Sequence, residues 1–125
     1  LMKYMYIMLG GALGSLMRFW ISEFISIRFQ GAFPAGIFFV NTAGAMLIGF
    51  LFGLLSVNGQ LDDKFRFLIF IGFLGGFTTF SSFALENMKL LKDGLIATSI
   101  LYMVLTNVLG IVLAFAGYFL GAKLK

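Results

Sequence analysis

The chain has 125 residues, of which 61% are hydrophobic and 11% charged, and its mean hydropathy is +1.04. Soluble domains are about half apolar, so this composition excludes a soluble protein and predicts an integral membrane protein. The absence of cysteine and histidine excludes disulfides, thiol chemistry and histidine acid–base catalysis. The net charge of +4 does not indicate a nucleic-acid partner, because most of the nine lysines and arginines end apolar runs, where they meet lipid headgroups.

Four apolar runs predict an all-α protein whose four transmembrane helices form a single domain over residues 1–125. The predicted spans are roughly residues 2–27, 34–56, 65–91 and 95–120. In the first span, Gly10 and Gly14 lie four residues apart and allow another helix to approach closely.

Arg18 lies well inside the first span, where an arginine costs about 2.5–3.5 kcal/mol on insertion scales. Two interpretations stay open. The side chain can snorkel to the membrane surface near Glu23. Alternatively, it is a cation at an anion vestibule or in a fixed contact with another helix.

The second span begins at Pro34, a residue suited to the first turn of a helix because its missing N–H is not needed there. Asn41 interrupts the span, and an amide there must face protein or a pore. It either makes an interhelical hydrogen bond or lines a pore, where its NH₂ group can donate to an anion. Asn58 and Gly59 predict the turn that leads into the third span.

The third span contains an unusual run at residues 72–83, Gly-Phe-Leu-Gly-Gly-Phe-Thr-Thr-Phe-Ser-Ser-Phe. Gly75 and Gly76 each weaken a helix by about 1 kcal/mol relative to alanine. The hydroxyl groups that follow can bond the backbone groups that a break would free. Non-helical backbone at membrane depth persists only where protein covers it or a watery cavity meets it. We therefore predict that the third helix is broken near its middle and lines an ion or substrate site.

The fourth span carries Tyr102, Thr106 and Asn107 as its polar members. Four spans place both termini on one side of the membrane. Apart from Arg18, five lysines and arginines fall on that side and three on the other, which is a weak orienting bias. Such a chain can insert both ways and pair with itself. Since four short helices are too few to seal an ion path, we expect an antiparallel, dual-topology homodimer.

Three motifs resemble the CrcB/Fluc family of fluoride channels, and the resemblance extends from end to end. They are residues 10–14 with Arg18, residues 34–36 with 40–44, and residues 75–83. The resemblance implies a two-pore antiparallel homodimer in the inner membrane of a bacterium, which exports cytoplasmic fluoride by passive diffusion. Its partners would be membrane lipids, the fluoride ion and a second copy of the chain.

The resemblance also implies roles for individual residues. Backbone carbonyls of Gly75 and Thr78 would hold a structural sodium ion, Na+, at the dimer axis. The implied fluoride pathway is lined by Asn41, Phe80, Ser81, Ser82, Phe83 and Tyr102. The sequence departs from the family at Ile37, where a threonine is frequent, and at Ser82, which replaces a frequent threonine but keeps the hydroxyl.

These residue types suit a passage for fluoride, which holds its water tightly and needs replacement donors. Serine, threonine and asparagine supply N–H and O–H donors. The edge of a phenyl ring carries partial positive charge, so an anion can meet Phe80 or Phe83 edge-on. A hard cation takes oxygen ligands, and the lack of a carboxylate near Gly75 favours a monovalent ion over calcium.

Other functions are weighed against this one. A small proton-coupled multidrug transporter of the four-helix type is the main alternative, but it needs a carboxylate deep in a span, and Glu23 and Glu86 lie near span ends. A non-transporting assembly subunit would leave the hydroxyl groups of the third span unexplained. A membrane-embedded enzyme is disfavoured because the sequence shows no acid–base pair.

Overall fold

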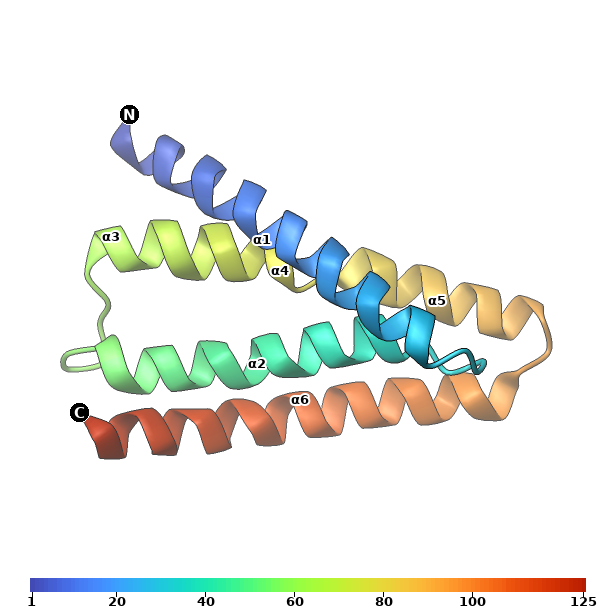
Figure 1. The fold of residues 1–125 in the computed structure, drawn as a ribbon. Coiled ribbons are helices and arrows are strands. Elements are labelled where there is room, and N and C mark those ends of the chain that lie inside the picture. Colours follow the sequence, from blue (N-terminus) through green and yellow to red (C-terminus); the bar gives the residue numbers. More distant parts are fainter.

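The structure is a computed structural model that describes residues 1–125, and it is all-helical apart from one isolated β-bridge. Four helical rods run along the molecule, and the third of them is interrupted (Figure 1). We call residues Asp63–Lys92 the third rod. In chain order the elements are α1 (Met2–Arg28), α2 (Ala35–Leu55), α3 (Asp63–Phe65), the π-helix η1 (Arg66–Leu74), α4 (Gly75–Phe77), α5 (Phe80–Lys92) and α6 (Ile96–Leu124).

The rods form two packed pairs. Helices α2 and α6 run antiparallel and make the most extensive contact in the molecule, while α1 crosses the third rod obliquely over η1 and α4 (Figure 1). Both termini lie at the same end of the bundle, as an even number of rods requires. At that end, Asn58 (φ 53°) and Gly59 (φ 76°) form the predicted turn, since a tight two-residue turn needs positive φ at both positions.

Glycines allow the backbones of α2 and α6 to touch. A Cβ atom at Gly49 would overlap the backbone carbonyl of Ala114, and one at Gly117 would overlap that of Met46. In lipid, helices gain little from burying apolar surface, so association depends on such close van der Waals contact. We call this contact the α2–α6 seam.

Glycines also allow close backbone contact between α1 and the third rod. Gly10 and Gly14 lie directly against the backbone of η1 and α4, which confirms the close approach predicted from their spacing. From the other side, a Cβ at Gly72 would lie 3.1 Å from the Cα of Gly10. The crossing is therefore backbone against backbone, and it holds α1 beside the interruption in the third rod.

Apolar side chains dominate the outside of the bundle. Only 18 of the 125 residues are buried, so most of the apolar side chains face outward, as in a protein that is solvated by lipid. Three helices are long and apolar enough to cross a membrane: α2, the third rod and α6. Helix α1 has 27 residues, or about 40 Å at 1.5 Å per residue, which exceeds the roughly 30 Å hydrocarbon core.

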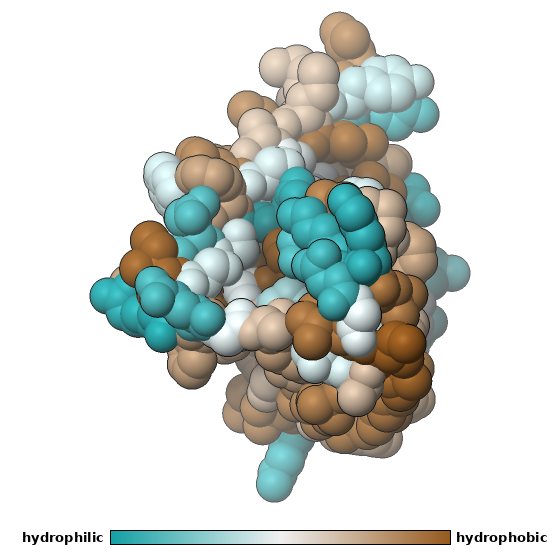
Figure 2. Space-filling model, turned by 90° about the vertical axis from the view of Figure 1, so that its right-hand side faces the viewer, coloured by the Kyte–Doolittle hydropathy of each residue, from teal (hydrophilic) through white to brown (hydrophobic).

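Hydrophilic residues gather at one end of the bundle, where the α1–α2 and α5–α6 connections lie (Figure 2). This end carries Lys92 at the end of α5, Asp93 directly after it, and Arg28 at the end of α1. Positive and polar groups at the ends of rods with apolar flanks are the expected arrangement for a multi-pass membrane protein.

Candidate functional site

The third rod is broken at Thr78 and Thr79, which both adopt extended backbone (φ −81°, ψ 153° and φ −149°, ψ 120°). This confirms a break near the middle of the third helix. The paired glycines do not themselves form the break, because Gly75 is helical (φ −62°, ψ −35°) and α4 contains both glycines. The break falls two residues further on.

Packing explains why glycine is needed at position 76 within the helix. A Cβ at Gly76 would lie 2.7 Å from the carbonyl oxygen of Gly11, so only glycine lets α1 approach at this point. The loss of helix propensity at glycine is compensated by this contact. Gly75 differs, because a Cβ there would meet nothing closer than 3.8 Å, and the residue is exposed.

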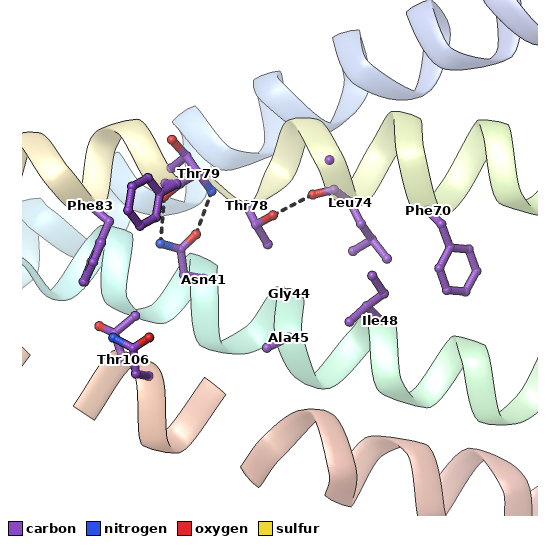
Figure 3. Close-up of a pocket in the computed structure, with 13 residues that line it drawn as sticks. Asn41, Gly44, Ala45, Ile48, Phe70, Leu74, Thr78, Thr79, Phe83 and Thr106 are labelled. Carbon is purple, nitrogen blue, oxygen red and sulfur yellow. Dashed lines mark hydrogen bonds between the residues drawn. The ribbon is translucent and has the colours of Figure 1, made fainter. Parts of the chain in front are cut away.

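Asn41 of α2 hydrogen-bonds the backbone at the break. Its side-chain Oδ1 accepts a 2.8 Å hydrogen bond from the Thr79 N–H, and its Nδ2 donates a 3.0 Å bond to the Thr79 carbonyl (Figure 3). The carboxamide thus replaces both backbone partners that Thr79 would have in a helix. This is the interhelical hydrogen bond considered from the sequence, and it leaves one of the two Nδ2 hydrogens available.

Arg18 of α1 hydrogen-bonds the backbone just before the break. Its Nε donates a 3.0 Å hydrogen bond to the carbonyl of Gly76, one of the last carbonyls before the break. Of the two interpretations of Arg18, the structure shows the fixed contact with another helix. A cation beside the C-terminal end of a helical segment also opposes the negative end of its dipole.

The hydroxyl groups of Thr78 and Thr79 bond backbone groups on either side of the break. Thr78 Oγ1 donates a 2.9 Å bond to the Leu74 carbonyl (Figure 3). Thr79 is the N-cap of α5, where its Oγ1 accepts a 3.1 Å bond from the N–H of Ser82 and lies 3.3 Å from the hydroxyl of Ser81. This is the role expected of the hydroxyl groups in this run, which is to bond backbone groups that a break frees. Threonine is one of the residues preferred at a helix N-cap.

The carbonyls of Gly75 and Thr78 at the break receive no donor from outside the helices. None of the backbone hydrogen bonds formed outside the helices is accepted by the carbonyls of Gly75 or Thr78, and no side chain donates to either of them. A carbonyl at membrane depth without a donor is costly, so these two oxygens are suited to an external ligand.

An open cavity of about 380 Å³ lies beside the break, between α2, the third rod and α6 (Figure 3). The predicted residues that line it are Asn41, Gly75, Thr78, Phe80 and Phe83. The other predicted residues, Ser81, Ser82, Tyr102 and Arg18, do not line this cavity. From α6, Thr106 and Asn107 contribute to the wall instead.

Aromatic rings continue from the cavity into the protein. The Phe80 and Phe83 centroids are 5.8 Å apart, and the Phe83 ring lies 5.0 Å from that of Tyr102. Phe80 is 79% exposed, although it sits at the centre of the third rod. Phe33, from the connection between α1 and α2, meets the other side of Tyr102 at 5.4 Å with edge-to-face geometry.

Two hydroxyl groups on α6 are buried without a hydrogen-bond partner. They are the phenolic oxygen of Tyr102 and the Oγ1 of Thr106, one turn further along. An unpaired buried hydroxyl costs about 1–3 kcal/mol, and each of these two can donate to a further partner. Thr106 was not assigned to the site from the sequence; its spacing of four residues from Tyr102 is the signal that could have found it.

The carboxylates lie away from the cavity. Glu23 is exposed on α1, and Glu86 pairs with Lys89 at 3.9 Å. Neither lines the cavity beside the break. The geometry therefore lacks the deep carboxylate that proton-coupled cation export requires.

The chain was compared with known proteins. The family "CrcB-like protein, Camphor Resistance (CrcB)" matches residues 5–118. A protein of Aquifex aeolicus named fluoride-specific ion channel FluC is 43% identical over 116 residues, covering 93% of this chain and 94% of that protein. The proteins of the same name from a Hydrogenobaculum species and from Thermus thermophilus are 42% and 41% identical, each over 98% of this chain and over 100% and 95% of their own lengths.

Proposed function

The chain belongs to the CrcB-like family, and on that premise we propose that it is a fluoride-specific ion channel. It is a multi-pass protein of a bacterial membrane that lets cytoplasmic fluoride leave by passive diffusion and is not an enzyme. The observation that carries the proposal is nearly full-length similarity to proteins named as such channels, in a chain whose third rod opens beside a cavity. Conduction requires a site that replaces the water of the ion but binds weakly enough to release it.

The fluoride pathway passes the phenylalanine pair. Phe80 and Phe83 present rings 5.8 Å apart at the cavity, and the positive edge of a phenyl ring can meet an anion without a competing formal charge. Asn41 lines the same cavity, and its remaining Nδ2 hydrogen is a donor for the ion.

Hydroxyl groups extend the pathway along α5 and α6. Ser81 and Ser82 follow the break on the first turn of α5, and their hydroxyls supply further donors. The Tyr102 hydroxyl, buried and unpartnered beside Phe83, gains its missing partner when an anion reaches it. An anion accepts hydrogen bonds from all three groups, so successive partial dehydration is compensated along the path.

A sodium ion would be held by the carbonyls of Gly75 and Thr78 from each of two chains. The support is the donor set itself: two open backbone oxygens at membrane depth, with no carboxylate beside them. Four neutral oxygens suit a monovalent hard cation, which would add positive charge next to the anion pathway. Side-chain hydroxyls take no part, since Thr78 Oγ1 is bound to Leu74.

The functional unit would be an antiparallel homodimer of dual topology. The cavity opens at the surface of a single chain, and its wall includes the exposed residues Phe80, Gly75 and Asn107. Amide and carbonyl groups exposed at membrane depth cannot be solvated by lipid. A second copy of the chain, related by a two-fold axis, would shield them from lipid. Such a dimer brings two breaks together and encloses two equivalent pathways.

Fluoride efflux from liposomes tests the function and the pathway together. We expect the purified protein to release fluoride, and Phe80→Ile and Asn41→Ala to cut efflux while dimers persist. Phe115→Ile is the matched control, since Phe115 is 60% exposed on α6 and does not line the cavity. Unaltered efflux in both pathway variants would overturn the residue assignment. Proton-dependent dye uptake without fluoride efflux would overturn the function in favour of the multidrug transporter.

A further inference from the structure

A pair of buried polar side chains joins α5 to α6 beyond the cavity. Ser99 Oγ donates a 2.8 Å hydrogen bond to Asn87 Oδ1, and Asn87 Nδ2 donates a 2.9 Å bond to the backbone carbonyl of Phe83. Ser99 is 0% exposed and Asn87 is 7% exposed. Polar groups buried this deeply in an apolar bundle are costly unless they are paired, and both side chains of this pair are hydrogen-bonded.

The pair supplies a polar link where packing is slight. Helix α5 touches α6 over a much shorter stretch than α2 does, and no glycine on α5 brings the two backbones together. A hydrogen bond between side chains fixes both the distance and the axial register of two helices, whereas apolar contact alone leaves sliding possible. The Asn87–Ser99 bond therefore determines where α5 sits along α6.

That register also sets the aromatic contact at the pathway. The helices are antiparallel: Asn87 lies one turn after Phe83 on α5, and Ser99 lies one turn before Tyr102 on α6. The Phe83–Tyr102 contact, at 5.0 Å between ring centroids, therefore lies about one helical turn from the Asn87–Ser99 hydrogen bond, in the same interface. A slip of one residue moves a helix by about 1.5 Å, enough to disturb rings packed at this distance.

We propose that Asn87 and Ser99 are positioning residues that hold the Phe83 ring against Tyr102 and thereby shape the anion pathway. The proposal rests on the proposed function. Asn87 also borders an open groove along α5 that includes Phe80 and Phe83, but Ser99 lines neither that groove nor the cavity beside the break. An effect of Ser99 on transport must therefore act through Asn87 and the position of α5.

Ser99→Ala tests this, because it removes the donor with the smallest change of volume. We expect fluoride efflux to fall roughly threefold to tenfold, the range that the loss of one interhelical hydrogen bond in a membrane protein supports. Ser22→Ala is the matched control, since the Ser22 hydroxyl donates only to Phe19 within its own helix. It should leave efflux unchanged.

A second readout separates positioning from general stabilisation. The chain has only four tyrosines, so ¹⁹F NMR of protein labelled with 3-fluorotyrosine can follow Tyr102, assigned by Tyr102→Phe. Ser99→Ala should shift the Tyr102 resonance, as Phe83→Ile is also expected to do, and leave the other three in place. Unchanged efflux, or reduced efflux with the Tyr102 resonance unmoved, would overturn the proposal. Absence of efflux from the wild type would instead contradict the proposed function.

Discussion

The α2–α6 seam and the break in the third rod hold helices together in opposite ways. Along the seam, glycines press backbone against backbone, and the one side-chain hydrogen bond between the two helices lies at their ends, where Lys125 donates to the carbonyl of Ser56. At the break, Asn41 and Arg18 reach across from two other helices to bond backbone groups of the third rod. Side chains from other helices thus bond the backbone where it is irregular, and apart from the Asn87–Ser99 pair the regular helices associate mainly by packing.

The difference follows from what lipid can and cannot solvate. A continuous helix satisfies its own N–H and C=O groups, so two such helices need only complementary shape to associate. A broken helix exposes groups that lipid cannot satisfy, and side chains from neighbouring helices must do so. The carbonyls of Gly75 and Thr78 receive no donor from these side chains.

The largest effect is expected from disrupting the seam. Gly49→Leu drives a side chain into the Ala114 backbone and should cost about 3 kcal/mol in the free energy of unfolding, the upper end of the range typical of overpacking. Titration with SDS, followed by circular dichroism, measures this. Gly110→Ala on α6 is the control, because a Cβ there meets nothing within 4 Å. Equal stability of the two variants would refute close backbone packing at the seam.

Removing the bridge at the break should have a smaller effect. Asn41→Leu leaves the N–H and carbonyl of Thr79 without partners, and we expect a loss of about 1–3 kcal/mol in the same titration. Asn107→Leu serves as the comparison, since the Asn107 amide donates only to Met103 in its own helix. If both substitutions cost the same, Asn41 does not bridge the break.

Weakening the cap after the break should cost less again. Thr79→Ala removes the oxygen that accepts from the N–H of Ser82, at an expected cost of about 1 kcal/mol. Thr79→Ser retains the hydroxyl and should restore most of the stability. Failure of the serine variant to do so would show that the methyl group, and not the cap, matters at this position.

The smallest effect is expected outside both regions. Asp63 pairs with Arg66 at 3.1 Å, but their side chains are 78% and 50% exposed. Exposed ion pairs contribute little, so Asp63→Asn should change the free energy of unfolding by less than about 0.5 kcal/mol. A larger loss would mean that the start of the third rod is more tightly coupled to the break than its exposure indicates.

The residue pattern predicted a good part of the architecture. Apolar runs separated by polar links indicated four helices, because the length of a span is dictated by membrane thickness. The glycine spacing in α1 indicated a close crossing, and Asn58 with Gly59 indicated a turn. For the site, the run at residues 72–83 indicated a break but did not show that it falls at the threonines and not at the glycines, since propensity alone ignores what a missing side chain contributes to packing.

Sequence by itself determined that this chain is a membrane protein with an interrupted third helix, since hydropathy and local propensity are properties of neighbouring residues. Only the tertiary structure decided that Asn41 and Arg18 hydrogen-bond the backbone at the break, from 38 and 58 residues away along the chain. It likewise decided that Asn87 meets Ser99. Hydrogen-bond partners depend on how helices cross and in which register, and that geometry emerges only when whole helices pack.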